Sequence, residues 1–129
     1  LGGYLPLEKV TETIGGSDIG VVPYLSDPFM NLALSTKIFE YVSMRMPVVA
    51  SRLDSITSAF DGKSIEYFEP GNADDLAGKL VRVCRAPASR KGYIERAARA
   101  YESMSWPVMS KRYLDEINGL ISSAIRVSA

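Results

Sequence analysis

The sequence predicts an α/β fold, in which a Rossmann-like parallel sheet carries helices on both faces and a helical C-terminal tail follows it. Three largely apolar runs, at residues 18–23, 48–53 and 65–68, have the composition of strands that are covered on both faces. Helical patterns alternate with these runs, and such alternation requires crossover connections and a parallel sheet. Parallel sheets usually contain more strands. We therefore expect the chain to be a partial domain whose sheet begins upstream.

The first predicted elements are a short helix at 7–14 and the strand at 18–23. Apolar side chains recur on one face of the helix, and two glycines end it. The strand is almost continuously apolar and ends at Pro23, so we expect it in the middle of the sheet. The loop at 24–34 follows the carboxyl end of this strand, which is where open α/β sheets bind ligands.

The next segment predicts a helix at 36–45 that is followed at once by the buried strand at 48–53. Ser35 or Thr36 is expected to cap the helix, because a short side-chain oxygen there accepts a hydrogen bond from the first turn. Apolar residues spaced three and four positions apart form one face of the helix. Pro47 ends it, since the residue before a proline is disfavoured in the helical region.

Turn and cap signals define the end of the alternating region. A short helix at 55–60 ends at an Asp-Gly turn, and the strand at 65–68 is closed by Pro-Gly. The helix at 72–84 begins with Asn72, which is a good cap, and two aspartates lie in its first turn, where the helix dipole favours them.

Two further helices are predicted at 89–104 and 108–127. The first is rich in alanine and carries most of a basic patch. We favour the interpretation that this patch is a solvated face over the interpretation that it attaches the protein to a membrane surface. Trp106 is expected to pack at the junction between the two helices, and the apolar stripe of the last helix needs a surface to cover it. The patch consists of Arg85, Arg90, Lys91, Arg96 and Arg99.

The composition excludes several classes of function. The 129 residues contain 15 basic and 15 acidic side chains, so charge gives no case for binding nucleic acid. No histidine is present, which removes Ser-His-Asp and Cys-His-Asn hydrolases and most zinc sites. The single cysteine, Cys84, cannot form an internal disulfide, and the N-terminus has no signal-peptide pattern. We therefore expect a cytoplasmic protein, at most peripheral to a membrane.

One carboxylate of the helix at 36–45 needs an explanation. Glu40 lies in the second turn and off the apolar face. An anion is favoured near a helix N-terminus, so Glu40 is either a solvated surface residue near Lys37 or the ligand-holding residue of a site in front of the helix.

Several motifs occur in one order along the chain, at spacings that match a known family. They are Ser17–Pro23, Lys37–Tyr41, Pro47–Ser51, Asp61–Gly62, Pro70–Asn72, Asp75–Ala77 and Trp106. In this combination the sequence resembles the C-terminal, donor-binding half of a retaining B-type glycosyltransferase of family 4, within the glycosyl transferases group 1. The likeness covers nearly the whole chain and depends on the combination, because no single motif is diagnostic.

The resemblance implies a nucleotide-sugar site around the start of the helix at 36–45. Glu40 occupies the place of a glutamate that holds two ribose hydroxyls, and an ionised carboxylate can accept hydrogen bonds from both members of a vicinal diol. The backbone N–H groups of Leu34, Ser35 and Thr36 are then expected to face the diphosphate. Lys37 is either a phosphate contact or a solvated side chain, and the sequence favours neither.

The sugar side of this site departs from the family pattern. Many members carry a second glutamate at the position that is Leu32 in this sequence. Asp27 and Asn31 are the sugar-side candidates in the loop, although Asp27 before a proline is slightly better explained as the start of a turn. The lysine and arginine that clamp the diphosphate in the family come from a segment before Leu1.

By resemblance, the full-length protein transfers a sugar from a nucleotide-diphosphate sugar to a glycan, lipid or small-molecule acceptor, with retention and without a metal or cofactor. Residues 1–106 are expected to be the later part of the nucleotide-sugar domain. Residues 107–129 are expected to cross to a missing N-terminal domain, so that this chain alone is inactive. Two alternatives are a stand-alone flavodoxin-like interaction module and a sugar-nucleotide epimerase on the same scaffold, although such epimerases usually rely on histidines.

Overall fold

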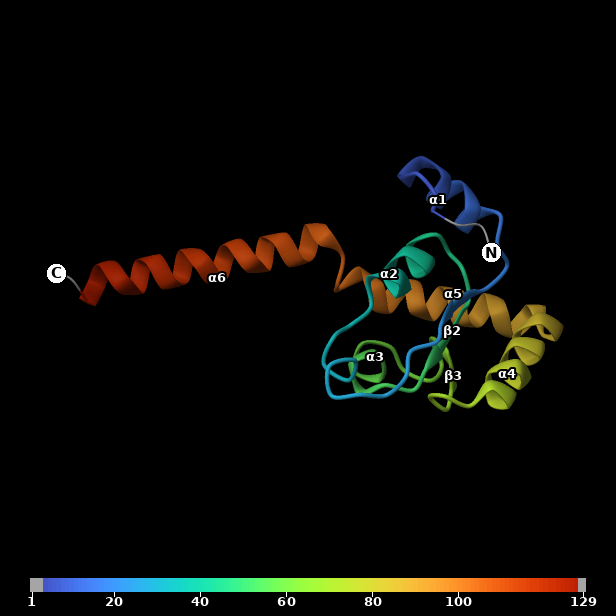
Figure 1. Cartoon of the computed structure of the whole chain (residues 1–129). Coiled ribbons are helices and arrows are strands. Elements are labelled where there is room, and N and C mark those ends of the chain that lie inside the picture. The colour runs from blue at the N-terminus through green and yellow to red at the C-terminus, as the bar shows by residue number, and fades with distance from the viewer. Residues whose placement is uncertain (1–3, 128–129) are drawn as a thin grey trace.

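A computed structural model describes the backbone of residues 4–127 and the side chains of residues 4–6 and 8–123. Its elements are α1 (Leu7–Gly15), β1 (Gly20–Val22), α2 (Thr36–Ser43), β2 (Val48–Ser51), α3 (Asp54–Ala59), β3 (Glu66–Phe68), α4 (Ala73–Arg85), α5 (Pro87–Glu102) and α6 (Trp106–Val127). Helices alternate with strands as far as β3, and only helices follow it, as the sequence predicts (Figure 1).

The described residues form one parallel sheet with the strand order β1-β2-β3. Val21 pairs with Val49, and Ala50 pairs with Tyr67. β2 is therefore the middle strand, and all of its residues are buried. The prediction that residues 18–23 lie in the middle of the sheet is wrong, because β1 is an edge strand in this part of the chain. An apolar run indicates that the two faces of a strand are covered, but it does not indicate how many neighbouring strands pair with that strand.

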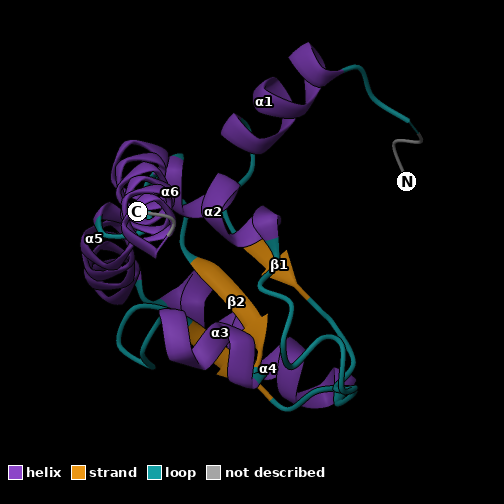
Figure 2. Ribbon diagram, turned by 90° about the vertical axis from the view of Figure 1, so that its left-hand side faces the viewer, coloured by secondary structure: helices purple, strands orange, loops and turns teal. Residues whose placement is uncertain are grey.

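Helices cover both faces of the sheet (Figure 2). On one face α2, α3 and α5 enclose the larger core, which includes Ile38, Phe60 and Ala97. On the other face α4 packs Val83 against Val49, together with a residue of β3. The predicted Rossmann-like α/β architecture is thus confirmed, and burial of these apolar side chains is the main force that holds the layers together.

Helix α2 ends at Ser43, two residues earlier than predicted. Arg45 has a φ of 58°, which lies in the left-handed region. The N–H of Arg45 donates to the carbonyl of Val42, and the N–H of Met46 donates to the carbonyl of Tyr41, both at 3.0 Å. These two bonds make a Schellman motif, which ends a helix and usually has glycine at the left-handed position.

One of the two predicted helix caps is confirmed and the other is wrong. The Oδ1 atom of Asn72 accepts a hydrogen bond of 2.9 Å from the N–H of Asp75 at the start of α4. Ser35 precedes α2, but its side chain makes no capping bond, because its hydroxyl lies 3.3 Å from that of Tyr24. Thr36 makes no capping bond either in the described residues.

The last helix, α6, extends away from the body of the molecule (Figure 1). Trp106 is 77% exposed, so the prediction that it packs at the junction is wrong. The reason is that α2, α3 and α5 already cover one face of the sheet and α4 covers the other. Its exposed large apolar residues are Trp106, Val108, Met109, Tyr113, Leu114, Ile117, Leu120 and Ile121. Of the helices within residues 4–127, none combines the length and hydropathy needed to cross a bilayer.

Candidate functional site

The candidate site begins where the loop at 23–35 leaves the carboxyl end of β1 and leads into α2. Two serine hydroxyls hold this loop against the sheet and against α3. Ser51 Oγ donates to the carbonyl of Tyr24 at 2.6 Å, and Ser55 Oγ donates to the carbonyl of Met30 at 2.8 Å. The loop therefore has a fixed path at the edge of the sheet where ligands of α/β proteins bind.

Asp27 and Asn31, the predicted sugar-side residues, both take part in the structure of this loop. Asp27 Oδ1 accepts a hydrogen bond of 2.8 Å from the N–H of Met30, so Asp27 does form the turn that its position before a proline indicates. Asn31 Nδ2 donates to Ser26 Oγ at 3.0 Å, and Asn31 Oδ1 accepts from the N–H of Asp54 at 3.2 Å. Asn31 thus ties the loop to α3. A contact of either side chain with a sugar stays a prediction.

The start of α2 presents its first turn without a side-chain cap. Leu34 and Ser35 are half-buried, whereas Thr36 and Lys37 are exposed. Because neither hydroxyl caps the helix, the N–H groups of the first turn keep their capacity to bind an anion. Lys37 forms no salt bridge with the described residues, and this is compatible with both interpretations of that side chain.

Glu40 is exposed and lies on the side of α2 that is turned toward α1. The two helices enclose an open pocket of about 320 Å³. Its lining residues are Val10, Thr11, Ile14, Glu40, Ser43 and Met44. The Glu40 carboxylate has no salt-bridge partner in the described part of the chain, and Lys37 therefore does not neutralise it.

The structure does not gather all predicted site residues in one cavity. Glu40 lines the pocket between α1 and α2, but residues 34–37 lie about one turn earlier and do not contribute to that pocket. Asp27 and Asn31 lie further upstream, in the loop. Leu32, where the resemblance places a second glutamate, is 87% exposed. The candidates thus follow one another from the loop to the start of α2 and then to the α1–α2 pocket.

The family model for glycosyl transferases group 1 matches residues 1–86 of the chain. The chain belongs to this family. The matched residues include the loop, α2 with Glu40, and the three strands that lie within residues 4–127. Membership implies a sugar donor and an acceptor in general terms, and it does not favour the stand-alone interaction module. No curated protein sequence matches the chain significantly.

In this glycosyltransferase the position of α2 depends on a contact that the sequence analysis did not find. A Cβ atom built on Gly20 would lie 2.4 Å from Cγ of Tyr41, so the tyrosine ring rests directly on the backbone of β1. A glycine inside a strand pattern does signal a close approach, but the pattern does not identify the partner. The anchors Ser51 and Ser55 were missed in the same way, although a buried hydroxyl must find an acceptor.

Tyr67 of β3 and Asp61, in the turn before β3, have shifted pKa values, and both have structural partners. The Arg52 guanidinium lies 5.2 Å from the ring centre of Tyr67, whose hydroxyl donates to the carbonyl of Phe60 at 2.7 Å. Burial raises the pKa of Tyr67 far above its usual range. A hydrogen bond from Ser64 lowers the pKa of Asp61. Among the residues described, no group of three or more Asp, Glu or Cys side chains could hold a metal ion.

Proposed function

We propose that this chain is the donor-binding part of a retaining, B-type glycosyltransferase that uses a nucleotide-diphosphate sugar. The observation that carries the proposal is the Glu40 carboxylate, which borders the pocket between α1 and α2 and has no salt-bridge partner among the described residues. A carboxylate in this setting can accept hydrogen bonds from a ligand without first breaking an ion pair of the protein.

The ribose of the donor is assigned to Glu40. Its two carboxylate oxygens accept one hydrogen bond from each hydroxyl of the vicinal diol, and such charge-assisted bonds are stronger than bonds between neutral groups. Val10, Ile14 and Met44 give the pocket apolar walls for the faces of the ribose and the base. The pocket volume of about 320 Å³ lies within the range of small-molecule sites.

The diphosphate is assigned to the start of α2. The uncapped N–H groups of the first turn, around residues 34–36, and the positive end of the helix dipole favour an anion there. Lys37 is close enough in sequence to add a positive charge that stabilises the leaving diphosphate. The contribution of this chain to catalysis is therefore to position the donor and to stabilise developing negative charge, without a metal or cofactor.

The assignments above do not include the acceptor or the N-terminal domain, but α6 has a surface that is suited to contact another domain. This helix exposes a row of apolar side chains and packs on neither face of the sheet. We assign residues 107–129 to an arm that crosses to the N-terminal domain; residues 128–129 are outside the described part of the chain. The separate chain is then expected to bind the donor weakly and to catalyse no transfer.

Binding of nucleoside diphosphates to the 129-residue chain tests this proposal. NMR titrations with uridine, guanosine, adenosine and thymidine diphosphates cover the bases, since the pocket does not fix one. We expect at least one of them to shift amide signals in residues 34–44. Glu40→Gln should weaken that binding by about 10- to 100-fold, because it removes hydrogen bonds to a charged acceptor worth about 1.5–3 kcal/mol.

Two comparisons control for indirect effects of this substitution. Glu116→Gln removes an exposed carboxylate from α6 and should leave the affinity unchanged. Far-ultraviolet circular dichroism should show the same fold for both variants, because Glu40 is exposed and forms no salt bridge with the described residues. Equal affinity of the parent chain and Glu40→Gln for the best diphosphate would remove the ribose assignment.

A further inference from the structure

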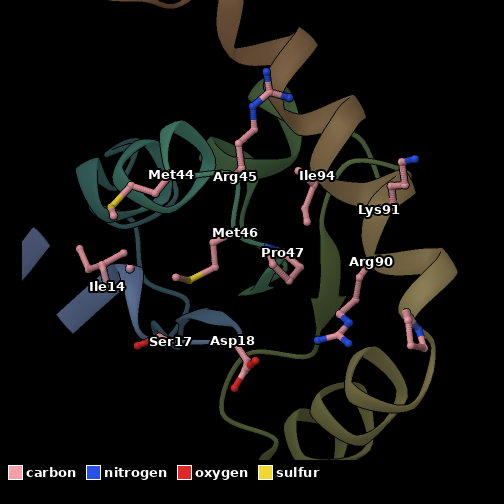
Figure 3. Close-up of a pocket in the computed structure, with 12 residues that line it drawn as sticks. Ile14, Ser17, Asp18, Met44, Arg45, Met46, Pro47, Arg90, Lys91 and Ile94 are labelled. Carbon is pink, nitrogen blue, oxygen red and sulfur yellow. The ribbon is translucent and has the colours of Figure 1, made fainter. Parts of the chain in front are cut away.

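A second and larger pocket adjoins the pocket that Glu40 lines, on the side of the amino ends of the strands. Its volume is about 450 Å³. It is bounded by the end of α1, by the segment that precedes β1, by the turn between α2 and β2, and by the first turns of α5 (Figure 3). The loop and the start of α2, which are assigned to the sugar and the diphosphate, follow the carboxyl end of β1, whereas this pocket lies at the amino ends of the strands. Apart from Ile14 and Met44, the two pockets share no lining residue.

The pocket has an apolar floor and a mainly cationic rim. Ile14, Met46, Pro47 and Ile94 contribute the apolar surface, and Met46 and Pro47 are themselves buried. Figure 3 shows Met46 and Pro47 in the middle of the cavity, with Ile14 of α1 on one side and Ile94 of α5 on the other. Such a floor can pack against the carbon atoms of a ligand, although it offers no partner for a charged group.

Three cationic side chains lie around this floor, opposite a single carboxylate. They are those of Arg45, Arg90 and Lys91, and the carboxylate is that of Asp18. Arg90 reaches from α5 toward Asp18, whereas Arg45 and Lys91 lie at the rim with their charged ends directed away from the middle of the cavity (Figure 3). Within the described residues none of the three forms a salt bridge. Their long, flexible side chains can therefore turn toward an anion at the mouth of the pocket without losing an ion pair.

The backbone of Arg45 provides independent support for a function of its side chain. Its φ of 58° is unfavourable for any residue with a Cβ atom, and glycine would end α2 in the same way at lower cost. Residues held in such conformations cluster at functional sites. An arginine at this position supplies a guanidinium group to the rim, which glycine cannot do.

We propose that this pocket binds a phosphate ester of a small polyol. Arg45, Arg90 and Lys91 bind the phosphate through charge-assisted hydrogen bonds, and the carbon atoms of the ester pack on the apolar floor. Asp18 accepts a hydrogen bond from a hydroxyl group of the same ligand. The ester has two natural sources, a soluble metabolite or the headgroup of an anionic lipid. This site uses none of the charged groups assigned to the donor, although Ile14 and Met44 border both pockets, and it would add a second ligand to glycosyl transfer.

Binding measurements on the 129-residue chain test the proposal with two probes. The soluble probe is glycerol phosphate, followed by NMR at the amide signals of residues 14–18, 44–47 and 90–94. The lipid probe is a phosphatidylcholine vesicle with added phosphatidylglycerol, compared with a vesicle of phosphatidylcholine alone in a co-sedimentation assay. Binding of the soluble ester alone identifies a metabolite site, and binding of the anionic vesicle alone identifies a headgroup site.

A pair of variants with equal net charge separates a built site from general attraction between charges. The double variant Arg90→Gln and Lys91→Gln should weaken binding of the responding probe about tenfold or more, because each cation contributes a charge-assisted bond. The matched double variant Lys111→Gln and Arg112→Gln removes two neighbouring exposed cations of α6 and should bind like the parent chain. An equal loss in both double variants, or no binding of either probe to the parent chain, would overturn the proposal.

A third variant guards against an effect on folding. Arg45→Gly removes one cation from the rim and at the same time relieves the left-handed backbone, so it should fold at least as well as the parent chain. We expect its melting temperature to be equal or higher and its affinity for the responding probe to be several-fold lower. Undiminished affinity in Arg45→Gly would remove Arg45 from the site and with it the explanation of its backbone conformation.

Discussion

The contact between Gly20 and Tyr41 places α2, and therefore Glu40, at a fixed distance from the sheet. A methyl group on Gly20 would lie 2.4 Å from Cγ and Cδ2 of the Tyr41 ring and 3.0 Å from its Cβ. Favourable contacts between carbon atoms lie at about 3.5–4.0 Å. The Cβ of Tyr41 is fixed to the helix backbone, so rotation of the ring alone cannot relieve the overlap. Gly20→Ala therefore has to push α2 away from β1.

The size of the effect follows from two opposing contributions. Overpacking of this kind costs about 1–3 kcal/mol. Alanine is favoured over glycine within a strand by about 0.5–1 kcal/mol. We therefore expect Gly20→Ala to lower the free energy of unfolding by about 1–2 kcal/mol, which corresponds to a drop of roughly 3–8 °C in melting temperature for a chain of this size.

Urea unfolding followed by far-ultraviolet circular dichroism measures this loss. Gly78→Ala in α4 is the matched control, because a Cβ there meets no atom within 4 Å. It should raise the free energy of unfolding by about 0.5–1 kcal/mol, since alanine is the better helix former. Opposite signs for the two glycines would identify the contact with Tyr41 as the cause.

A double variant checks the cause directly. Tyr41→Ala removes the ring, so Gly20→Ala should cost much less in that background than in the parent chain. The two losses should thus be non-additive, as is usual for residues in contact. The reasoning is refuted if Gly20→Ala stabilises the parent chain, or if its effect is the same with and without the ring.

Three further predictions concern other parts of the fold. Arg45→Gly should raise the free energy of unfolding by about 0.5–1 kcal/mol in the same urea assay, because it relieves the left-handed residue of the Schellman motif, and a loss would contradict this account. Burial raises the pKa of Tyr67 above its value in the unfolded chain, so the associated stability is present below about pH 10 and declines as the pH rises toward the folded-state pKa. Tyr67→Phe should lower the free energy of unfolding by about 1–2 kcal/mol at neutral pH, because the carbonyl of Phe60 loses its buried donor. The free energy of unfolding of this variant should also decline less steeply in alkaline solution than that of the parent chain. An unchanged alkaline decline would exclude Tyr67 as its source. Glu66→Gln should lower the free energy of unfolding by about 1–2 kcal/mol, because the buried Glu66 carboxylate pairs with cations of α4 and accepts a hydrogen bond from the hydroxyl of Tyr93. An unchanged free energy of unfolding would show that these contacts hold α4 and α5 only weakly.

The order and type of the elements were predictable because they depend on local patterns. Periodic apolar residues and turn signals fixed the helices and strands, and Asn72 capped α4 as expected. The end of α2 was predicted too late, because Pro47 marks where a helix must have stopped, whereas the left-handed Arg45 stops it earlier. The middle position predicted for residues 18–23 is not found among the described residues, where β1 is an edge strand, because the number of pairing partners leaves no mark on the pattern of a strand.

The site could be predicted only where a local pattern or the family resemblance pointed to it. Glu40 was singled out because it is a carboxylate off the apolar face of α2, and its pocket with α1 could not be foreseen, since no pattern states which helix faces it. Ser35 failed as a cap because the hydroxyl of Tyr24 competes for it, which is a contact between distant residues. Trp106 failed as a core residue because burial depends on free apolar surface elsewhere in the fold.

The central claim is that Glu40 binds the ribose diol of the donor. The most direct measurement is a binding cycle, in which the parent chain and Glu40→Gln are each titrated with the best-binding nucleoside diphosphate and with its dideoxy analogue. The account predicts that removal of the two hydroxyls weakens binding about tenfold or more in the parent chain and has little effect in Glu40→Gln. An equal loss in both proteins would show that the hydroxyls are recognised elsewhere and would contradict the claim.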